Sequence, residues 1–176
     1  MEVKSFKTLE FNKIIDKLQN YAGSELGKKI AGQLTSYTDI DEIKLHQGET
    51  SEAVTMILKE GSLGMGGLRD ISTYIKRVNV GGSLNIVELL HIADFLRVAK
   101  RAKNYGQAEG KNDSFPILEP RFNAIELAND LERDIERCII SPTEVSDDAS
   151  STLREIRRNI KISNDRIKEQ LNSIIH

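Results

Sequence analysis

The sequence predicts an all-α protein, a helical bundle over roughly residues 1–140 with a projecting long helix behind it. Apolar residues recur at spacings of three and four through most of the chain, which is the helical period. Glycines and N-cap residues punctuate these runs where helices would begin and end. Of 176 residues, 39% are apolar and 30% are charged, with three prolines and no tryptophan, a composition typical of a helix-rich globular protein.

Three helices are expected before residue 61. Thr8 and Ser24 are candidate caps for the first two, and Thr38–Asp41 begins the third. Glycines end the first and third helices, while an interior glycine, Gly48, leaves the continuity of the third open. The residues expected to face the core are Leu9, Ile14, Ile15, Leu18 and Tyr21 in the first helix, Leu26, Ile30 and Leu34 in the second, and Ile40, Ile43, Ala53, Val54, Ile57 and Leu58 in the third.

Residues 61–70, GSLGMGGLRD, form a glycine-rich loop that invites comparison with a phosphate-binding loop. The first glycine and Gly66 have the required spacing, but Gly67 and Leu68 follow where a P-loop needs lysine and Ser/Thr. No strand is expected before the loop. A structural turn is therefore favoured, with Arg69 in a packing or capping contact, and this part of the chain is expected neither to bind nor to hydrolyse ATP.

A short helix capped by Asp70 and a long one from Asn85 to Tyr105 are expected next. Glu88 follows the N-cap Asn85 by three residues, which is the capping-box pattern, and Gly106 ends the helix. Residues that recur at helical spacing within it are Leu89, Leu90, Ala93, Leu96, Ala99 and Ala102.

A polar loop over 104–116 separates this helix from the next. Pro120 suits a first helical turn, and the helix is expected to continue to about Ile140, where Ser141-Pro142 breaks it. Its expected inward residues are Ile125, Leu127, Ala128, Leu131 and Ile135.

The segment from Ser150 to His176 has a helical pattern that neither glycine nor proline interrupts. Ser150 or Ser151 is its candidate cap, and Asp147 and Asp148 lie near its positive end. Its seam residues, spaced close to a coiled-coil repeat, are Leu153, Ile156, Ile160, Ser163, Ile167, Leu171 and Ile174. Its basic residues are Arg154, Arg157, Arg158, Lys161, Arg166 and Lys168. The pattern is still running at the last residue, so a truncated helix is expected.

No catalytic or metal constellation is apparent. The three histidines, His46, His91 and His176, are widely spaced, and Cys138 has no histidine partner, so a buried inert thiol is expected there. Capping explains the acidic pairs Asp39/Asp41 and Asp147/Asp148 without a metal.

The bulk properties point to a cytoplasmic protein. A single cysteine excludes an internal disulfide and suggests a reducing compartment. The N-terminus lacks the apolar region of a signal peptide, and no run approaches the length needed to cross a membrane. The net charge of −2 means that any contact with nucleic acid must be local.

Three stretches carry a family resemblance: GGLRDI at 66–71, NVGGSL at 79–84 and LLHIADFLRVAKR at 89–101. They resemble the N-terminal part of the second bacterial MutS paralogue, the MutS-II family of MutS-like ATPases with a C-terminal Smr nuclease domain. The resemblance implies a core-forming N-terminal region over 1–149 and the start of a lever or clamp helix over 150–176. A small turn or hairpin is implied at 141–150.

The resemblance further implies a homodimeric, ATP-dependent DNA-binding protein with no membrane association. Such a protein suppresses homologous recombination by acting on branched or mismatched DNA, and it rescues collided ribosomes. ATP and Mg²⁺ would be required by the full-length protein, an ATPase with an Smr endonuclease domain, and not by these residues. No catalytic residue is carried over.

The basic stripe of the last helix is the candidate nucleic-acid contact: Arg154, Arg157, Arg158 and Lys161. The competing interpretation is a solvated coiled-coil face, which is favoured for any single residue. The alternative function is a free-standing helical protein–protein adaptor. A small helical enzyme is disfavoured because no site is apparent.

Overall fold

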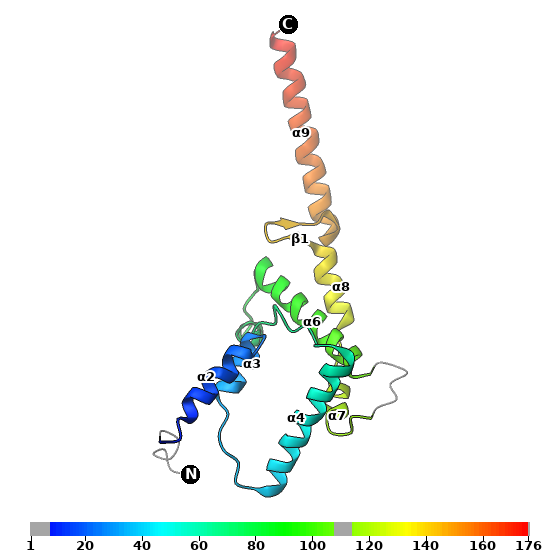
Figure 1. Cartoon of the computed structure of the whole chain (residues 1–176). Helices are drawn as coiled ribbons and strands as arrows, with labels where there is room; N and C mark the ends of the chain where they lie inside the picture. Colours follow the sequence, from blue (N-terminus) through cyan, green and yellow to red (C-terminus); the bar gives the residue numbers. More distant parts are fainter. Residues whose placement is uncertain (1–7, 108–113, 176) are drawn as a thin grey trace.

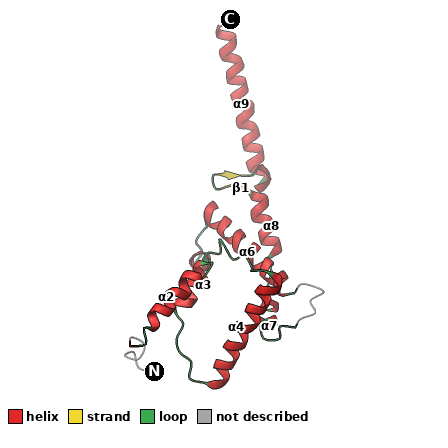
Figure 2. Cartoon of the chain, in the orientation of Figure 1, coloured by secondary structure: helices red, strands yellow, loops and turns green. Residues whose placement is uncertain are grey.

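The computed structural model describes residues 8–107 and 114–175, and in these the fold is all-α as predicted. Helices dominate, and one short hairpin supplies the only strands of the described ranges (Figure 2). The elements are α2 (Phe11–Tyr21), α3 (Glu25–Gly32), α4 (Ile40–Glu60), α5 (Ser72–Asn79), α6 (Ile86–Gly106), α7 (Glu119–Asn123), α8 (Asn129–Cys138), β1 (Ile139–Ser141), β2 (Glu144–Val145), a 3₁₀ turn (Asp147–Ala149) and α9 (Ser151–Ile175). The part of the predicted 104–116 loop over 108–113, and His176, lie outside the described residues.

Helices α2 and α3 form an antiparallel pair at the N-terminal side of the molecule (Figure 1). Ser24 caps α3 as predicted, accepting a hydrogen bond from the Gly27 amide at 3.1 Å. The prediction that Thr8 caps the first helix is wrong. Glu10 occupies the cap position of α2 with φ 52°, a left-handed turn from which the helix starts at Phe11.

Helix α4 is one continuous helix despite its interior glycine. Asp39 caps it through hydrogen bonds from two backbone amides, and Gly61 ends it at φ 81°. Gly48 has a packing role, because a Cβ atom there would come within 2.6 Å of the Ile117 side chain. Glu52 strengthens the same contact by accepting hydrogen bonds from the Ile117 and Leu118 amides at 3.1 and 2.9 Å.

The capping box that starts α6 is confirmed. The Asn85 side chain accepts from the Glu88 amide at 2.9 Å, and the Glu88 carboxylate accepts from the Asn85 amide at 3.0 Å. Arg77 of α5 completes the arrangement, since one of its guanidinium nitrogens lies 2.8 and 2.9 Å from the two carboxylate oxygens. A nearly buried Glu88 thus has partners on both sides, as a desolvated carboxylate requires.

The core lies where α6 crosses α8 and β1. Ala93 is fully buried, and Ile135 and Ile139 pack beside it with 5% and 7% exposure. Small Ala93 lets the neighbouring helix approach closely.

The helix predicted from Pro120 to about Ile140 is two helices, so that prediction is wrong. Ala128 adopts φ −104° and ψ 62°, outside the helical region. The Ile125 carbonyl accepts a hydrogen bond from the Lys103 side chain at 2.7 Å, which ties the segment between α7 and α8 to α6. Pro120 does lie in the first turn, of α7. Leu131, expected to be buried, is 48% exposed.

The predicted core faces of the first three helices are largely wrong. Helix α2 packs mainly on α3, and α4 packs on the segment before α7. Within the described residues few other contacts cover these three helices. The accessible surface is 13,309 Å², whereas a compact protein of 19.8 kDa would expose about 8,600 Å². The predicted core residues found exposed are Leu9, Ile14, Leu18, Tyr21, Ile30, Leu34, Ile40, Val54, Ile57 and Leu58.

The connection predicted at 141–150 is a hairpin followed by a 3₁₀ turn. Strands β1 and β2 pair antiparallel, with Ile139 opposite Val145. Helix α9 then leaves the hairpin and projects away from the rest of the molecule (Figure 1).

Candidate nucleic-acid interface

The candidate interface lies on α9, an uninterrupted helix of 25 residues. At 1.5 Å per residue it is about 37 Å long. Ser150, one of the two predicted caps, accepts a long hydrogen bond of 3.5 Å from the Leu153 amide. The base of α9 contacts the body through the 3₁₀ turn and the hairpin.

Two different faces run along α9. With about 100° of rotation per residue, the six seam aliphatics fall within an arc of about 60°. The four candidate nucleic-acid residues, Arg154, Arg157, Arg158 and Lys161, centre about 120° away from the seam. The basic stripe and the apolar seam are therefore separate surfaces, and one partner can bind either without covering the other.

The structure divides the four candidates into two pairs. Arg154 pairs with Asp148, and Arg157 pairs with Asp147 while donating to the Val145 carbonyl at 2.8 Å. These two arginines fasten the arm to its base. Asp147 and Asp148 thus form ion pairs, where the sequence suggested caps.

The 3₁₀ turn with Asp147 and Asp148 also reduces an unfavourable electrostatic interaction at the start of α9. Cations at a helix N-terminus face the positive end of the helix dipole, which is unfavourable, and Arg154 and Arg157 lie in the first two turns of α9. Aspartates immediately before the helix compensate for both the dipole and the arginines. The pairs are exposed, so each contributes little to stability but restricts the direction of the arm.

Arg158 and Lys161 form the second pair. Neither has a hydrogen bond or an ion pair with any residue in the described ranges, and both are exposed. They lie three residues apart, so they are neighbours on one face of the helix. They remain free to meet phosphates, while Arg154 and Arg157 would first have to leave their aspartates. Nucleic-acid binding by these four residues stays a prediction.

The glycine-rich loop lacks the features of a P-loop. It is irregular, it follows helix α4 and not a strand, and it lacks the lysine and Ser/Thr that a P-loop supplies. Arg101 and Tyr105 of α6 donate to the Gly64 and Gly61 carbonyls at 3.3 and 2.8 Å, so the loop serves as a connection. Arg69 is exposed and lines a shallow pocket beside Lys28.

The side chains of His46, His91 and Cys138 all contact neighbouring residues of the helical body. His46 contacts Glu49 at 3.0 Å, and His91 contacts the Tyr74 hydroxyl at 3.0 Å. Cys138 is half-buried, not buried as predicted, and it lies at the edge of the core where α8 meets the hairpin. The described ranges contain no group of three or more His, Cys, Asp or Glu that could hold a metal ion.

Three carboxyl groups, those of Glu49, Asp70 and Glu88, have lowered pKa values. Each forms an ion pair with a residue of another helix or segment. The Asn85 amide, followed by the Arg77 guanidinium, lowers the pKa of Glu88. Hydrogen bonds from Ser72 and Lys29 lower the pKa of Asp70. Burial opposes ionisation of Glu49, but hydrogen bonds from Arg121 and His46 outweigh it and lower the pKa. Hydrogen bonds from neighbouring residues therefore stabilise the ionised form of each of these carboxyl groups.

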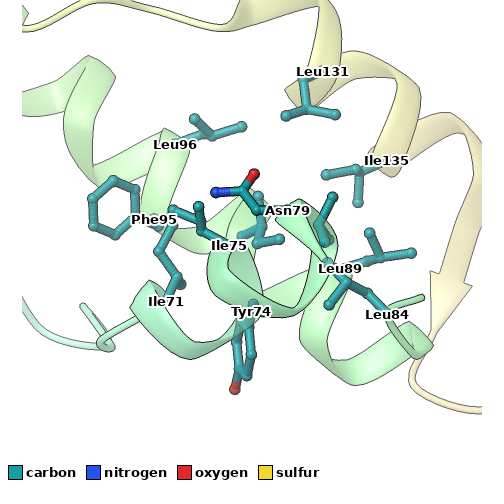
Figure 3. A pocket seen from close by; sticks show the side chains of 12 residues that line it. Ile71, Tyr74, Ile75, Asn79, Leu84, Leu89, Phe95, Leu96, Leu131 and Ile135 are labelled. Atoms are coloured by element: carbon teal, nitrogen blue, oxygen red, sulfur yellow. The ribbon is translucent and has the colours of Figure 1, made fainter. Parts of the chain in front are cut away.

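Sequence reasoning missed an apolar groove between α5, α6 and α8 (Figure 3). The groove has a volume of about 690 Å³, and Asn79 is the one residue with an amide side chain among its otherwise apolar or aromatic lining. Ile75 and Leu96 line it from α5 and α6, and Leu131 and Ile135 from α8. Helices α5 and α8 are mostly polar, and the signal in the sequence was the one narrow apolar face of each, with Ile75 and Val78 in α5 and Leu131 and Ile135 in α8.

No helix in the described part of the chain has the length and apolar character needed to span a bilayer. No protein-family model matches the chain. The geometry defines a helical scaffold with a projecting arm.

Curated relatives match this scaffold over nearly its whole length. Proteins called Endonuclease MutS2 are similar to it in Clostridioides difficile (44% identity over 176 residues), Lachnoclostridium phytofermentans (40% over 181) and Alkaliphilus oremlandii (38% over 175). The matches cover 99%, 100% and 99% of this chain, and 22%, 23% and 22% of the relatives. The chain belongs to the MutS2 family and corresponds to its N-terminal region, and it spans about a fifth of the length of these relatives.

Proposed function

We propose that this chain is the body and outgoing arm of a MutS-like, ATP-dependent DNA-binding protein of the cytoplasm. The observation that carries the proposal is α9, a long helix that projects from a helical body. The chain that contains it matches a MutS2 protein over 99% of its own length. In this function the body supports the arm, and the arm leads toward a part that clamps DNA.

The complete protein would hydrolyse ATP with Mg²⁺ and would act as a homodimer on branched or mismatched DNA, suppressing homologous recombination. The name of the relatives, Endonuclease MutS2, supports an endonuclease activity of the complete protein, which would also rescue collided ribosomes as a second role. ATP and Mg²⁺ would be bound outside these residues, since the loop at 61–70 lacks phosphate-binding chemistry.

A free-standing helical adaptor is the alternative. The apolar groove and the exposed faces of α2 to α4 favour a protein that binds other proteins. Identity of 38–44% to MutS2 proteins over nearly the whole chain favours the MutS2 assignment over the adaptor. In a MutS2 protein the same apolar surfaces would contact other parts of the same protein.

The arm's role is tested with a four-way DNA junction and fluorescence anisotropy over a range of salt concentrations. The chain should bind weakly, with affinity falling as salt rises. Replacing Arg158 and Lys161 together by glutamine should reduce the salt slope by about 1.8, since each lost phosphate contact contributes about 0.9.

The matched control is Arg166→Gln, which removes an arm cation from another face and should leave the slope nearly unchanged. Arg154→Gln with Arg157→Gln should have a smaller effect than the Arg158/Lys161 variant, because both arginines are already paired. Tight binding that ignores the Arg158/Lys161 change would refute a role for this stripe.

A further inference from the structure

The 3₁₀ turn over Asp147–Ala149, called here the acidic turn, presents two carboxylates to the first two turns of α9. Asp148 forms an ion pair with Arg154, and Asp147 forms one with Arg157. A guanidinium group binds carboxylates and phosphates through the same kind of charge-assisted hydrogen bond. Each carboxylate of the acidic turn therefore takes the place that a DNA phosphate would take on the same arginine.

The acidic turn is held in position by contacts that do not involve the arm. The Ser146 amide, just before the turn, donates to the Cys138 carbonyl at 2.8 Å, and the Ser146 hydroxyl accepts from the Asp148 amide at 3.1 Å. Arg137 of α8 donates to the Asp148 carbonyl. The two carboxylates consequently stay beside the base of α9 even when the arginine side chains of the arm move.

The basic stripe is one continuous surface of which the protein neutralises half. With about 100° of rotation per residue, its four cations fall within an arc of about 100° and along about 10 Å of the helix. They are Arg154, Arg157, Arg158 and Lys161. The two cations nearest the base face two aspartates, so their charges cancel, whereas no carboxylate pairs with the two distal cations within the described ranges.

We propose that the acidic turn is an autoinhibitory contact, in which Asp147 and Asp148 occupy Arg154 and Arg157 in place of DNA phosphates and confine phosphate binding to the distal half of the stripe. This inference rests on the proposed DNA contact and adds its regulation. A phosphate at the base of the arm would have to displace a carboxylate and would then lie beside two fixed charges of its own sign. The four paired side chains are between 41% and 66% exposed, so this competition occurs at the surface and requires no repacking of the body.

Removing the two negative charges tests the block. Asp147→Asn with Asp148→Asn, the acidic-turn variant, keeps the shape of both side chains and leaves Arg154 and Arg157 without an anion. Exposed ion pairs are individually weak, so this variant should bind the four-way DNA junction about tenfold more tightly than the wild type at about 50 mM salt. Its salt slope should be steeper by up to about 1.8, because two phosphate contacts are gained, and the gain in affinity should nearly vanish at about 200 mM salt.

Two controls separate the block from a general gain of positive charge. Glu144→Gln with Glu155→Gln makes the same change in net charge close to the acidic turn, on carboxylates that form no ion pair in the described part of the chain. Screening should keep its effect on affinity below about twofold. Adding Arg154→Gln and Arg157→Gln to the acidic-turn variant should abolish the gain, since the two pairs of residues are coupled. Circular dichroism of every variant confirms that the helices are retained.

The outcomes distinguish this inference from the proposed function. Salt-sensitive binding by the wild type with no gain in the acidic-turn variant would overturn the block and leave the DNA contact standing. A gain of equal size in the Glu144/Glu155 control, or one that persists without Arg154 and Arg157, would also overturn the block. Failure of the wild type and the acidic-turn variant alike to bind the junction would refute the DNA contact itself, and the block with it.

Discussion

Helices α6 and α9 both carry a regular apolar stripe, yet one is buried and the other is not. Ala93 of α6 is completely buried beneath Ile135 and Ile139, whereas Ile167 of α9 is 53% exposed. The difference lies in the neighbours: α7, α8, β1 and the Arg77 side chain of α5 contact α6, while α9 contacts the turn and hairpin at its base. An amphipathic sequence therefore predicts which face of a helix seeks cover, but the cover itself comes from elsewhere.

The largest expected change in the free energy of unfolding comes from an Ile→Ala substitution in the body, which is compared with the same substitution in α9. Ile135→Ala should lower the free energy of unfolding by about 2 kcal/mol, near the small end for buried isoleucine, because one side of Ile135 already borders the groove. Ile167→Ala should change it by less than about 0.5 kcal/mol. Urea denaturation of the two variants and the wild type measures both changes. Equal losses would mean that the arm is covered in solution and would break the comparison.

A smaller effect is expected at the start of α6. Asn85→Ala removes the side-chain acceptor of the capping box and should cost about 1 kcal/mol. Asn85→Ser is the matched control, since serine supplies the same acceptor in a capping box and should retain most of the stability. The same denaturation measurement applies. A loss for serine as large as that for alanine would show that the cap bond is not what stabilises the start of α6.

Local signals predicted the elements well because they depend on a few neighbouring residues. The caps at Ser24 and Asn85, the glycine stop at Gly61 and the uninterrupted helix after Ser150 all follow from short-range hydrogen bonding and backbone freedom. The failure at 124–128 had a tertiary cause, since the Lys103 contact to Ile125 joins residues 22 positions apart. No local pattern contains that information.

Burial was predicted poorly for the complementary reason. Apolar faces on α2 to α4 were expected to lie in a core, but Ile14, Ile30 and Leu58 are exposed because the described residues supply no further layer. The candidate site was predicted as a stripe of four cations. The division into Arg154 and Arg157, paired at the base, and the open pair beyond them depended on how the 3₁₀ turn places its aspartates.

The smallest expected effect is a pH dependence confined to the body. The Asn85 amide and the Arg77 guanidinium lower the pKa of Glu88 below its ordinary value of 4.5. The folded-state pKa is thus below the unfolded one, so the ionised carboxylate stabilises the fold above about pH 4.5, and this stabilisation is lost as pH falls through the folded pKa.

Glu88→Gln isolates this contribution, because glutamine keeps the shape and can still accept the Asn85 amide hydrogen bond but carries no charge to pair with Arg77. The stability difference between the wild type and this variant should be greatest near pH 7 and should shrink as the pH falls below about 4.5 and through the lowered folded-state pKa of Glu88. Glu169→Gln on the arm is the control for the loss of one carboxylate charge, since Glu169 makes no ion pair with the described residues. Urea titrations at several pH values between about 3 and 7 separate the two. If the Glu88→Gln difference is independent of pH, the Arg77–Glu88 pair does not stabilise the junction of α5 and α6, and packing alone distinguishes the body from the arm.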